Sequence, residues 1–114
     1  MTDPLSTKKC KPCEGGVAPL TATQAKQLLQ QLPKWQLTSD GRWIFKDFEF
    51  KNFYRTMAFV NAVAWVANQE DHHPDMEVGY KHCMVRFTTH AISGLSENDL
   101  ICAAKIGQLF DETP

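Results

Sequence analysis

Hydrophobic positions recur with two different periods along the chain, and the changes of period predict alternating helices and strands. The first helix begins at Thr21, which has capping-box spacing to Gln24, and ends at Pro33. Its apolar stripe recurs at helical spacing and consists of Ala25, Leu28, Leu29 and Leu32. This segment therefore predicts an amphipathic helix.

A strand follows a turn in the next stretch. Residues 35–38 form a short extended piece, residues 39–41 have turn chemistry, and residues 42–50 alternate as a strand does. The aromatic residues of this strand are Trp43, Phe45, Phe48 and Phe50. We expect the first two on one face and the last two on the other, with a bulge near Lys46 and Asp47.

The longest periodic segment, residues 53–68, predicts a helix with Asn52 as its N-cap. Pro74 lies beyond its end. The expected apolar stripe consists of Phe53, Met57, Val60, Ala64 and Ala67, widened by Val63 and Trp65.

Two more strands and a final helix complete the pattern. The strands are indicated by the alternation of Met76, Val78 and Tyr80 and then of Cys83, Val85 and Phe87, with a hairpin turn near residues 80–82. Residues 96–99 repeat the capping-box pattern before a helix that carries Leu100, Ala103, Ala104, Ile106 and Phe110. The order α-β-β-α-β-β-α predicts an α+β fold, with helices gathered on one face of an antiparallel sheet.

Composition narrows the class of protein. The 114 residues suit one domain, and we expect a loosely ordered extension over residues 1–20 before a single domain over residues 21–114. The formal net charge of -1 argues against a nucleic-acid partner. We see no apolar run long enough for a membrane span and no signal peptide, so we expect a cytoplasmic protein.

The candidate chemistry lies in histidines. His72 and His73 are adjacent between a helix end and Pro74, and His90 ends the last strand, with His82 between them in the sequence. A reference pKa of ~6.5 lets imidazole give and take protons at neutral pH. The alternative is that these histidines are only solvated loop and strand ends.

Metal binding is a further alternative, in a metal-dependent hydrolase. Three histidines can ligate zinc, but adjacent histidines point apart and no H-E-x-x-H pattern is present. Cys10 and Cys13 have C-x-x-C spacing, which is half a zinc site or a feature of the tail without catalytic importance. Cys83 and Cys102 fall on apolar stripes and are expected in the core.

The spacing of these residues resembles that of a known family. Residues 70–74 (EDHHP), followed by Tyr80, His90 and Asp99, resemble the signature of the pterin-4a-carbinolamine dehydratases. The segments 45–53, 88–90 and 94–97 are also similar to that family, so the resemblance covers roughly residues 20–110. The extension with Cys10 and Cys13 is similar to the N-terminus of bacterial members that accompany a phenylalanine hydroxylase.

The resemblance implies a fold and an activity. The fold would be a four-stranded antiparallel sheet with three helices packed on one face, in homodimers or homotetramers joined at sheet edges. The reaction would remove water from 4a-hydroxytetrahydrobiopterin or a related pterin to give the quinonoid dihydropterin. This would recycle the cofactor of an aromatic amino acid hydroxylase, with no metal or organic cofactor in the dehydratase itself.

The resemblance also implies roles for single residues. The catalytic positions would be His72, His73 and His90, and the pterin contacts would be Asp71, His72, His73, Thr88, Thr89, His90 and Ala91. His72 and His90 would be the acid/base pair, while His73 would bind and orient the ring. Asp99 and position 68 would be supporting residues. Many relatives carry an acid at that second position, where this chain has Asn68.

A second function remains open at this stage. Animal members of the family also act as dimerisation partners of a homeodomain transcription factor through a helical surface. In this chain that surface would involve residues 53–68. A regulatory partner protein without catalysis is therefore the alternative to a dehydratase.

Overall fold

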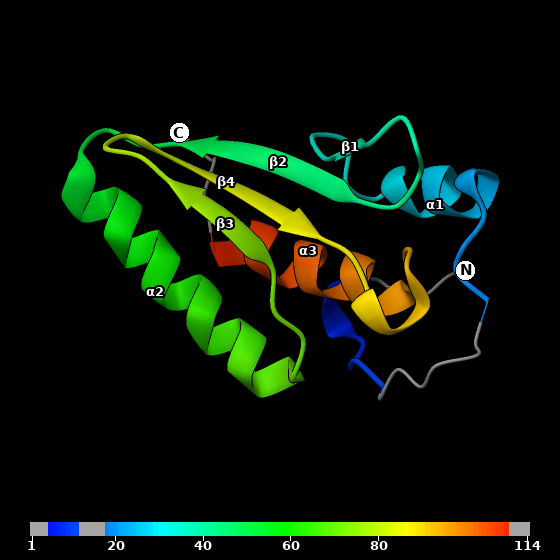
Figure 1. Ribbon diagram of the computed structural model, residues 1–114. Helices are drawn as coiled ribbons and strands as arrows, with labels where there is room; N and C mark the ends of the chain where they lie inside the picture. The colour runs from blue at the N-terminus through cyan, green and yellow to red at the C-terminus, as the bar shows by residue number, and fades with distance from the viewer. Residues whose placement is uncertain (1–4, 12–17, 110–114) are drawn as a thin grey trace.

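Antiparallel pairing of alternating strands builds the sheet on which the core forms. The computed structural model describes residues 5–11 and 18–109. The strands are β1 (Gln36–Leu37), β2 (Ile44–Glu49), β3 (Asp75–Val78) and β4 (His82–Phe87), in the spatial order β1-β2-β4-β3. The helices are α1 (Ala22–Leu29), α2 (Phe53–Glu70) and α3 (Glu97–Leu109), gathered on one face of the sheet (Figure 1). This confirms the predicted fold class and element order.

The register of β2 against β4 corrects one prediction. Pairing runs without interruption from Ile44 opposite Phe87 to Glu49 opposite His82. The bulge expected near Lys46 and Asp47 is therefore wrong. Trp43 and Phe45 have odd numbers and Phe48 and Phe50 even ones, so regular alternation already sends the two pairs to opposite faces. The even positions Ile44 and Phe48 are buried against the helices with Cys83, Val85 and Phe87.

The predicted helix starts are confirmed. Thr21 and Gln24 form both halves of a capping box, and Asn52 caps α2 by accepting a hydrogen bond from the Arg55 N–H at 2.9 Å. At the start of α3, the Asp99 carboxylate accepts a hydrogen bond from the backbone N–H of Ser96 at 2.9 Å. Local sequence chemistry therefore sets where each helix begins.

The buried face of α2 differs from the predicted stripe. It consists of Thr56, Phe59, Val63, Val66 and Ala67, whereas Phe53 and Trp65 are 45% and 63% exposed. Apolar residues lie all round this helix, so its period alone does not select a face. Contact with β4 and α3 selects it.

The β3–β4 hairpin turns earlier than predicted. β3 ends at Val78, and the N–H of Gly79 bonds to the carbonyl oxygen of His82 at 2.8 Å. Tyr80 therefore lies in the turn and is exposed rather than continuing the strand. A Cβ at Gly79 would stand 2.5 Å from the ring of exposed His82, so a larger residue at this position would require that ring to move.

Residues 5–11, here called the N-terminal segment, lie against α3. Leu5 is only 2% exposed and starts a short 3-10 helix, η1 (Leu5–Thr7), beside α3. Lys8 forms an ion pair with Glu97 at 2.9 Å, and the Lys105 ammonium donates to the Ser6 carbonyl at 3.1 Å. The division of the chain at residue 20 remains a prediction.

Candidate active site

The end of α2 turns the chain so that two histidines leave the helix together. Asp71 caps the helix in the left-handed conformation, with φ of 52°. The N–H groups of Asp71 and His72 both bond to the carbonyl oxygen of Ala67, the second at 3.2 Å. Aspartate tolerates this conformation better than most residues do. The turn brings His72 and His73 beside β4. Buried Pro74 then leads the chain into β3.

The second contribution comes from the end of β4. The chain passes through Thr88 and Thr89 into a short 3-10 helix, η2 (His90–Ile92). Thr89 pairs with Gly94 as an isolated bridge, and the Thr88 hydroxyl donates to the Arg42 carbonyl oxygen at 2.5 Å. This small loop is therefore closed on itself and tied to the start of β2. It presents His90 at a defined place.

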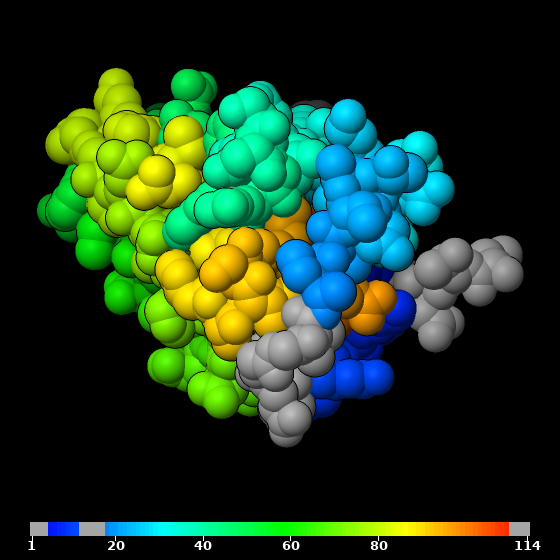
Figure 2. Space-filling model, turned by 45° about the vertical axis from the view of Figure 1, so that its right-hand side comes forward, coloured from blue at the N-terminus to red at the C-terminus, as the bar shows by residue number. Residues whose placement is uncertain are grey.

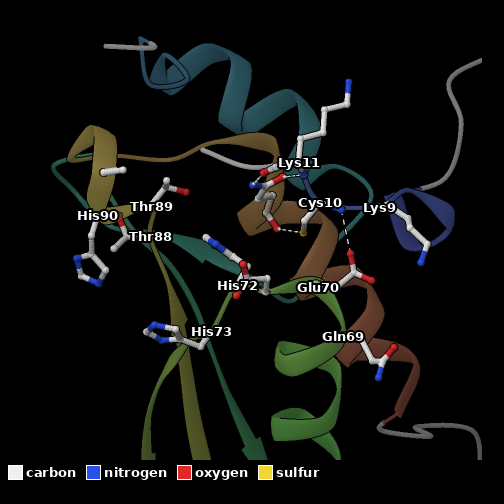
Figure 3. Close-up of a pocket in the computed structure, with 13 residues that line it drawn as sticks. Lys9, Cys10, Lys11, Gln69, Glu70, His72, His73, Thr88, Thr89 and His90 are labelled. Carbon is white, nitrogen blue, oxygen red and sulfur yellow. Dashed lines mark hydrogen bonds between the residues drawn. The ribbon is translucent and has the colours of Figure 1, made fainter. Parts of the chain in front are cut away.

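These two ends and the N-terminal segment surround one pocket of about 550 Å³. Its lining consists of Lys9, Cys10, Lys11, Gln69, Glu70, Asp71, His72, His73, Thr88, Thr89, His90, Ala91 and Asn98. Figure 2 shows these segments, distant in the sequence, on one face of the molecule, and Figure 3 shows the lining residues. All seven predicted pterin contacts line this pocket. Their role in catalysis remains a proposal.

His72 is the most constrained of the three histidines. Its Nε2 lies 2.6 Å from Oδ1 of Asp99, and the two side chains are 13% and 0% exposed. The imidazole also stacks on the Phe87 ring, with the ring planes 8° apart. A hydrogen bond at one edge and an aromatic ring on one face leave this side chain little freedom to rotate.

Asp99 is itself held by two further donors. Its Oδ2 accepts hydrogen bonds from the Thr89 hydroxyl at 2.8 Å and from the Ser96 N–H at 2.9 Å. A carboxylate that accepts these two bonds acts as an acceptor toward His72 as well, so the His72 proton belongs on Nε2. The other ring nitrogen, Nδ1, is then the one able to exchange a proton with a bound molecule. Asp99 therefore acts from behind the pocket, without lining it.

His73 and His90 are exposed residues on the open side of the pocket. The His90 ring lies edge-to-face against Trp43, with 5.8 Å between ring centres and 80° between planes. Arg86 lies over the same indole at 5.9 Å. An aromatic contact thus fixes one side of His90, whereas a buried carboxylate fixes His72.

The two threonines of the lining have their hydroxyls engaged within the protein. Thr88 and Thr89 are 7% and 3% exposed, and the Thr89 hydroxyl lies 2.8 Å from that of Ser96 as well as bonding to Asp99. These hydroxyl groups hold the loop and the carboxylate in place. The motif predicts which threonines are important, but only the structure shows what they hold.

The supporting position 68 does not reach this network. Asn68 is exposed and is not among the pocket-lining residues. Glu70 does line the pocket, but its Oε1 accepts the Cys10 N–H at 2.9 Å and its Oε2 lies 3.7 Å from the Lys105 ammonium. Burial raises the pKa of Glu70, but the Cys10 N–H and the Lys105 charge outweigh burial and lower that pKa below its ordinary value.

Sequence reasoning missed one wall of the pocket, the part built by Lys9, Cys10 and Lys11. The backbone N–H of Lys11 donates to the Asn98 side chain at 3.0 Å, and the Asn98 amide donates back to the Lys11 carbonyl at 2.6 Å. The nearest signal in the sequence is the C-x-x-C spacing of Cys10 and Cys13. Cys13 lies outside the described residues, so its pairing or metal binding is not described.

Two further findings concern residues 5–11 and 18–109. Within these ranges, no group of three or more histidine, cysteine, aspartate or glutamate side chains is arranged to hold a metal ion. In the same ranges, none of the helices is both long enough and apolar enough to cross a membrane.

Known sequences similar to this chain point to one family. The model of the family described as pterin 4 alpha carbinolamine dehydratase matches residues 18–109. A protein of Nitrosomonas eutropha is 65% identical over 107 residues, which cover 93% of each chain. One from Legionella pneumophila strain Corby is 60% identical over 111 residues, covering 96% of this chain and 98% of the other. Both relatives are named for pterin-4-alpha-carbinolamine dehydratase.

Solved structures show the same fold. A transcriptional coactivator/pterin dehydratase from Brucella melitensis superposes with a TM-score of 0.76 at 30% identity, covering 80% of this chain and 97% of that one. A pterin dehydratase-like protein described as a RuBisCO assembly factor in the alpha-carboxysome gives a TM-score of 0.59 at 22% identity. It covers 67% of this chain and 88% of its own, and it supports the fold alone.

Proposed function

The chain belongs to the pterin-4a-carbinolamine dehydratase family of hydro-lyases, and from this premise we propose that its three-histidine pocket dehydrates a 4a-hydroxytetrahydropterin. The products are the quinonoid dihydropterin and water. The observation that supports this most is the convergence of His72, His73 and His90 on one pocket, with His72 held by a buried carboxylate.

The reaction requires a proton to be delivered and another to be removed. The hydroxyl on carbon 4a is a poor leaving group, so an acid must protonate the departing oxygen. The lone pair of the adjacent ring nitrogen expels it, and a base takes the proton from that nitrogen. General acid–base assistance of this kind contributes typically ~10²–10⁴-fold.

The pocket contains histidines held in different ways, which can deliver one proton and remove the other. We assign His72 and His90 as the acid/base pair that flanks the ring, with His73 binding and orienting it. His72 comes from the turn after α2 and His90 from η2, so a flat ring between them meets a histidine from each element. With Nε2 of His72 bonded to Asp99, its Nδ1 exchanges the proton.

The test follows the decay of the 4a-hydroxy intermediate in a purified hydroxylase reaction. We expect wild-type protein to accelerate this decay and His72→Ala and His90→Ala to lose roughly 10²-fold or more of that acceleration. His82→Ala is the matched control, because His82 lies in β4 outside this pocket, paired with Asp47 at 2.9 Å. Wild-type rates in both pocket variants would overturn the assignment.

The finer parts of the function are also proposals. We propose that the product returns to an aromatic amino acid hydroxylase in the cytoplasm, and the described cysteines are free, as is usual for thiols in that compartment. We also propose a homodimer or homotetramer. The edge strand β3 has an unpaired side, and Phe53, Tyr54 and Trp65 of α2 are exposed.

The alternative is a regulatory binding protein. It is favoured by the coactivator name of the Brucella melitensis relative and by the exposed aromatic residues of α2. The decay assay separates the two functions, because a protein that only binds would leave the intermediate to decay at its spontaneous rate.

A further inference from the structure

Two cysteine thiols meet where the N-terminal segment crosses α3. The Sγ atoms of Cys10 and Cys102 lie 3.5 Å apart, although the residues are 92 positions apart in the sequence. Both cysteines are free, and Cys10 also lines the pocket. The acid–base mechanism uses neither thiol. Sulfur atoms in van der Waals contact need to approach by only about 1.5 Å to reach a disulfide length of ~2.05 Å.

We propose that Cys10 and Cys102 form an oxidisable dithiol site whose co-reactant is a small-molecule disulfide, and that the resulting bond fastens one wall of the pocket to α3. The exchange balances in two steps. The Cys10 thiolate attacks the small disulfide and releases one thiol, and the Cys102 sulfur then attacks Cys10 and releases the second. Two protein thiols are oxidised, and one small disulfide is reduced to two thiols.

The surroundings of the two sulfurs set the order of these steps. Cys10 is half-buried at the pocket wall, whereas Cys102 is 1% exposed. Because Cys102 is almost fully buried, an external disulfide reaches Cys10 first, and the hydrogen bond with Cys10 and burial raise the pKa of the Cys102 thiol. Cys10 is the entry point, and Cys102 is the resolving sulfur held beside it.

The backbone around Cys10 is already positioned for the bond. Glu70 accepts the Cys10 N–H, as Figure 3 shows, and the next residue exchanges two hydrogen bonds with the Asn98 side chain. Because these contacts hold the segment on α3, little further chain entropy is lost when the sulfurs join. The N-terminal segment lies outside residues 18–109, which the family model matches, whereas its partners Glu70, Asn98 and Cys102 lie inside them.

Oxidation would affect the turn that carries His72 and the start of α3 through two lost hydrogen bonds. The Cys102 sulfur lies 3.8 Å from the His72 carbonyl oxygen and the Cys10 sulfur 3.6 Å from the Asn98 carbonyl oxygen, so each carbonyl is within reach of an S–H donor. A disulfide has no S–H, so both carbonyl groups lose a donor while the wall moves toward α3. We expect slower dehydration in the oxidised state, a consequence that rests on the proposed function.

The experiment incubates the reduced full chain with glutathione buffers of increasing oxidised fraction. The intact mass should fall by two hydrogens, a peptide linking Cys10 to Cys102 should appear, and Tm should rise by about 5 °C or more because the link closes a long loop. The kcat/KM for the 4a-hydroxy intermediate should fall roughly threefold or more and recover with reductant.

Matched cysteine variants show which two sulfur atoms form the link. Cys10→Ser and Cys102→Ala should form no link, whereas Cys83→Ser and Cys13→Ser should form it as the wild type does. Cys83 is a suitable control because it lies on β4, where burial and then the Asp47 charge raise its thiol pKa to about 11. Peptide mapping of the wild type alone remains decisive if Cys102→Ala does not fold.

The readouts separate this inference from the proposed function. A glutathione adduct on Cys10 that is never resolved, or a link from Cys10 to Cys13 instead, would overturn the dithiol site whatever the catalytic rates. A Cys10–Cys102 link with equal kcat/KM in both states would overturn the effect on the pocket. Absence of any dehydration by the reduced wild type would count against the proposed function, while the mass and Tm would still test the link.

Discussion

Two histidine–aspartate pairs in this molecule have the same chemistry and very different surroundings. His72 and Asp99 are 2.6 Å apart with 13% and 0% of their side chains exposed, beside the pocket. His82 and Asp47 are 2.9 Å apart on adjacent strands with 48% and 41% exposed. Surface pairs of this kind contribute little to stability, whereas a buried carboxylate with three donors fixes whatever it binds.

The difference shows how a histidine becomes useful for catalysis. The exposed pair is free to exchange its partner for water at little cost. The buried pair cannot, because Asp99 would then keep two donors on Oδ2 and lose the one on Oδ1 in a place without solvent. Burial therefore lets a histidine–aspartate hydrogen bond set the orientation and the tautomer of the ring.

Replacing Asp99 is expected to have the largest effect. Asp99→Asn puts an amide where the Thr89 hydroxyl and the Ser96 N–H both donate, so at least one buried donor loses its acceptor. We expect the dehydration rate to fall roughly 10²-fold or more and the free energy of unfolding to fall by about 2–4 kcal/mol. Decay of the 4a-hydroxy intermediate and urea unfolding measure the two effects. A folded variant with the wild-type rate would contradict the role of the pair.

Replacing Thr89 tests the hydrogen bond that Oδ2, the other oxygen of the Asp99 carboxylate, accepts. Thr89→Val keeps the side-chain shape and removes the hydroxyl that donates to Asp99. We expect about 1–2 kcal/mol less stability and a dehydration rate lower by roughly tenfold, with the loss in kcat rather than in KM. Thr89→Ser keeps the hydroxyl and should recover most of the rate. Equal rates in the valine and serine variants would mean that the hydroxyl does not position His72.

The buried pair also shows how far the sequence predicts this site. The element order, the caps at Thr21 and Asn52 and the pocket position of the three histidines follow from local spacing and from the family resemblance. The hydrogen bond from Thr89 to Asp99 does not follow from them, because a sequence motif identifies a residue without identifying its hydrogen-bond partner. Such bonds depend on how β4 and α3 pack.

Two other features could not be predicted from the local sequence, because they also depend on how distant segments pack together. The buried face of α2 is chosen by contact with β4 and α3, since its apolar residues lie all round the helix. Docking of the N-terminal segment relies on bonds such as that from Cys10 to Glu70, 60 residues away in the sequence. The segment has few large apolar residues of its own, so its composition does not indicate these contacts with distant partners.

Glu70 should show an effect between those of the two pairs. Glu70→Gln keeps an acceptor for the Cys10 N–H and loses the charge beside Lys105, and we expect about 0.5–1 kcal/mol less stability at pH 7. A pKa below the ordinary value of 4.5 means that Glu70 stabilises the fold above that pH, and the contribution is lost as the pH falls through the lowered pKa. Urea unfolding should therefore show a larger gap between wild type and variant at pH 7 than near pH 3. An equal gap at both would contradict a charge effect.

The smallest effect is expected for Asp47→Asn, the direct counterpart of Asp99→Asn. The variant removes the charge beside His82, but water can replace the lost partner because both side chains are nearly half exposed. We expect the free energy of unfolding to change by less than about 0.5 kcal/mol, with that small difference disappearing in about 1 M salt, and the dehydration rate to stay at the wild-type value. Urea unfolding at two salt concentrations and the intermediate-decay assay measure this. A loss of rate comparable to that of Asp99→Asn would show that hydrogen bonding to aspartate, and not burial beside the pocket, gives a histidine its role, and the contrast between the pairs would fail.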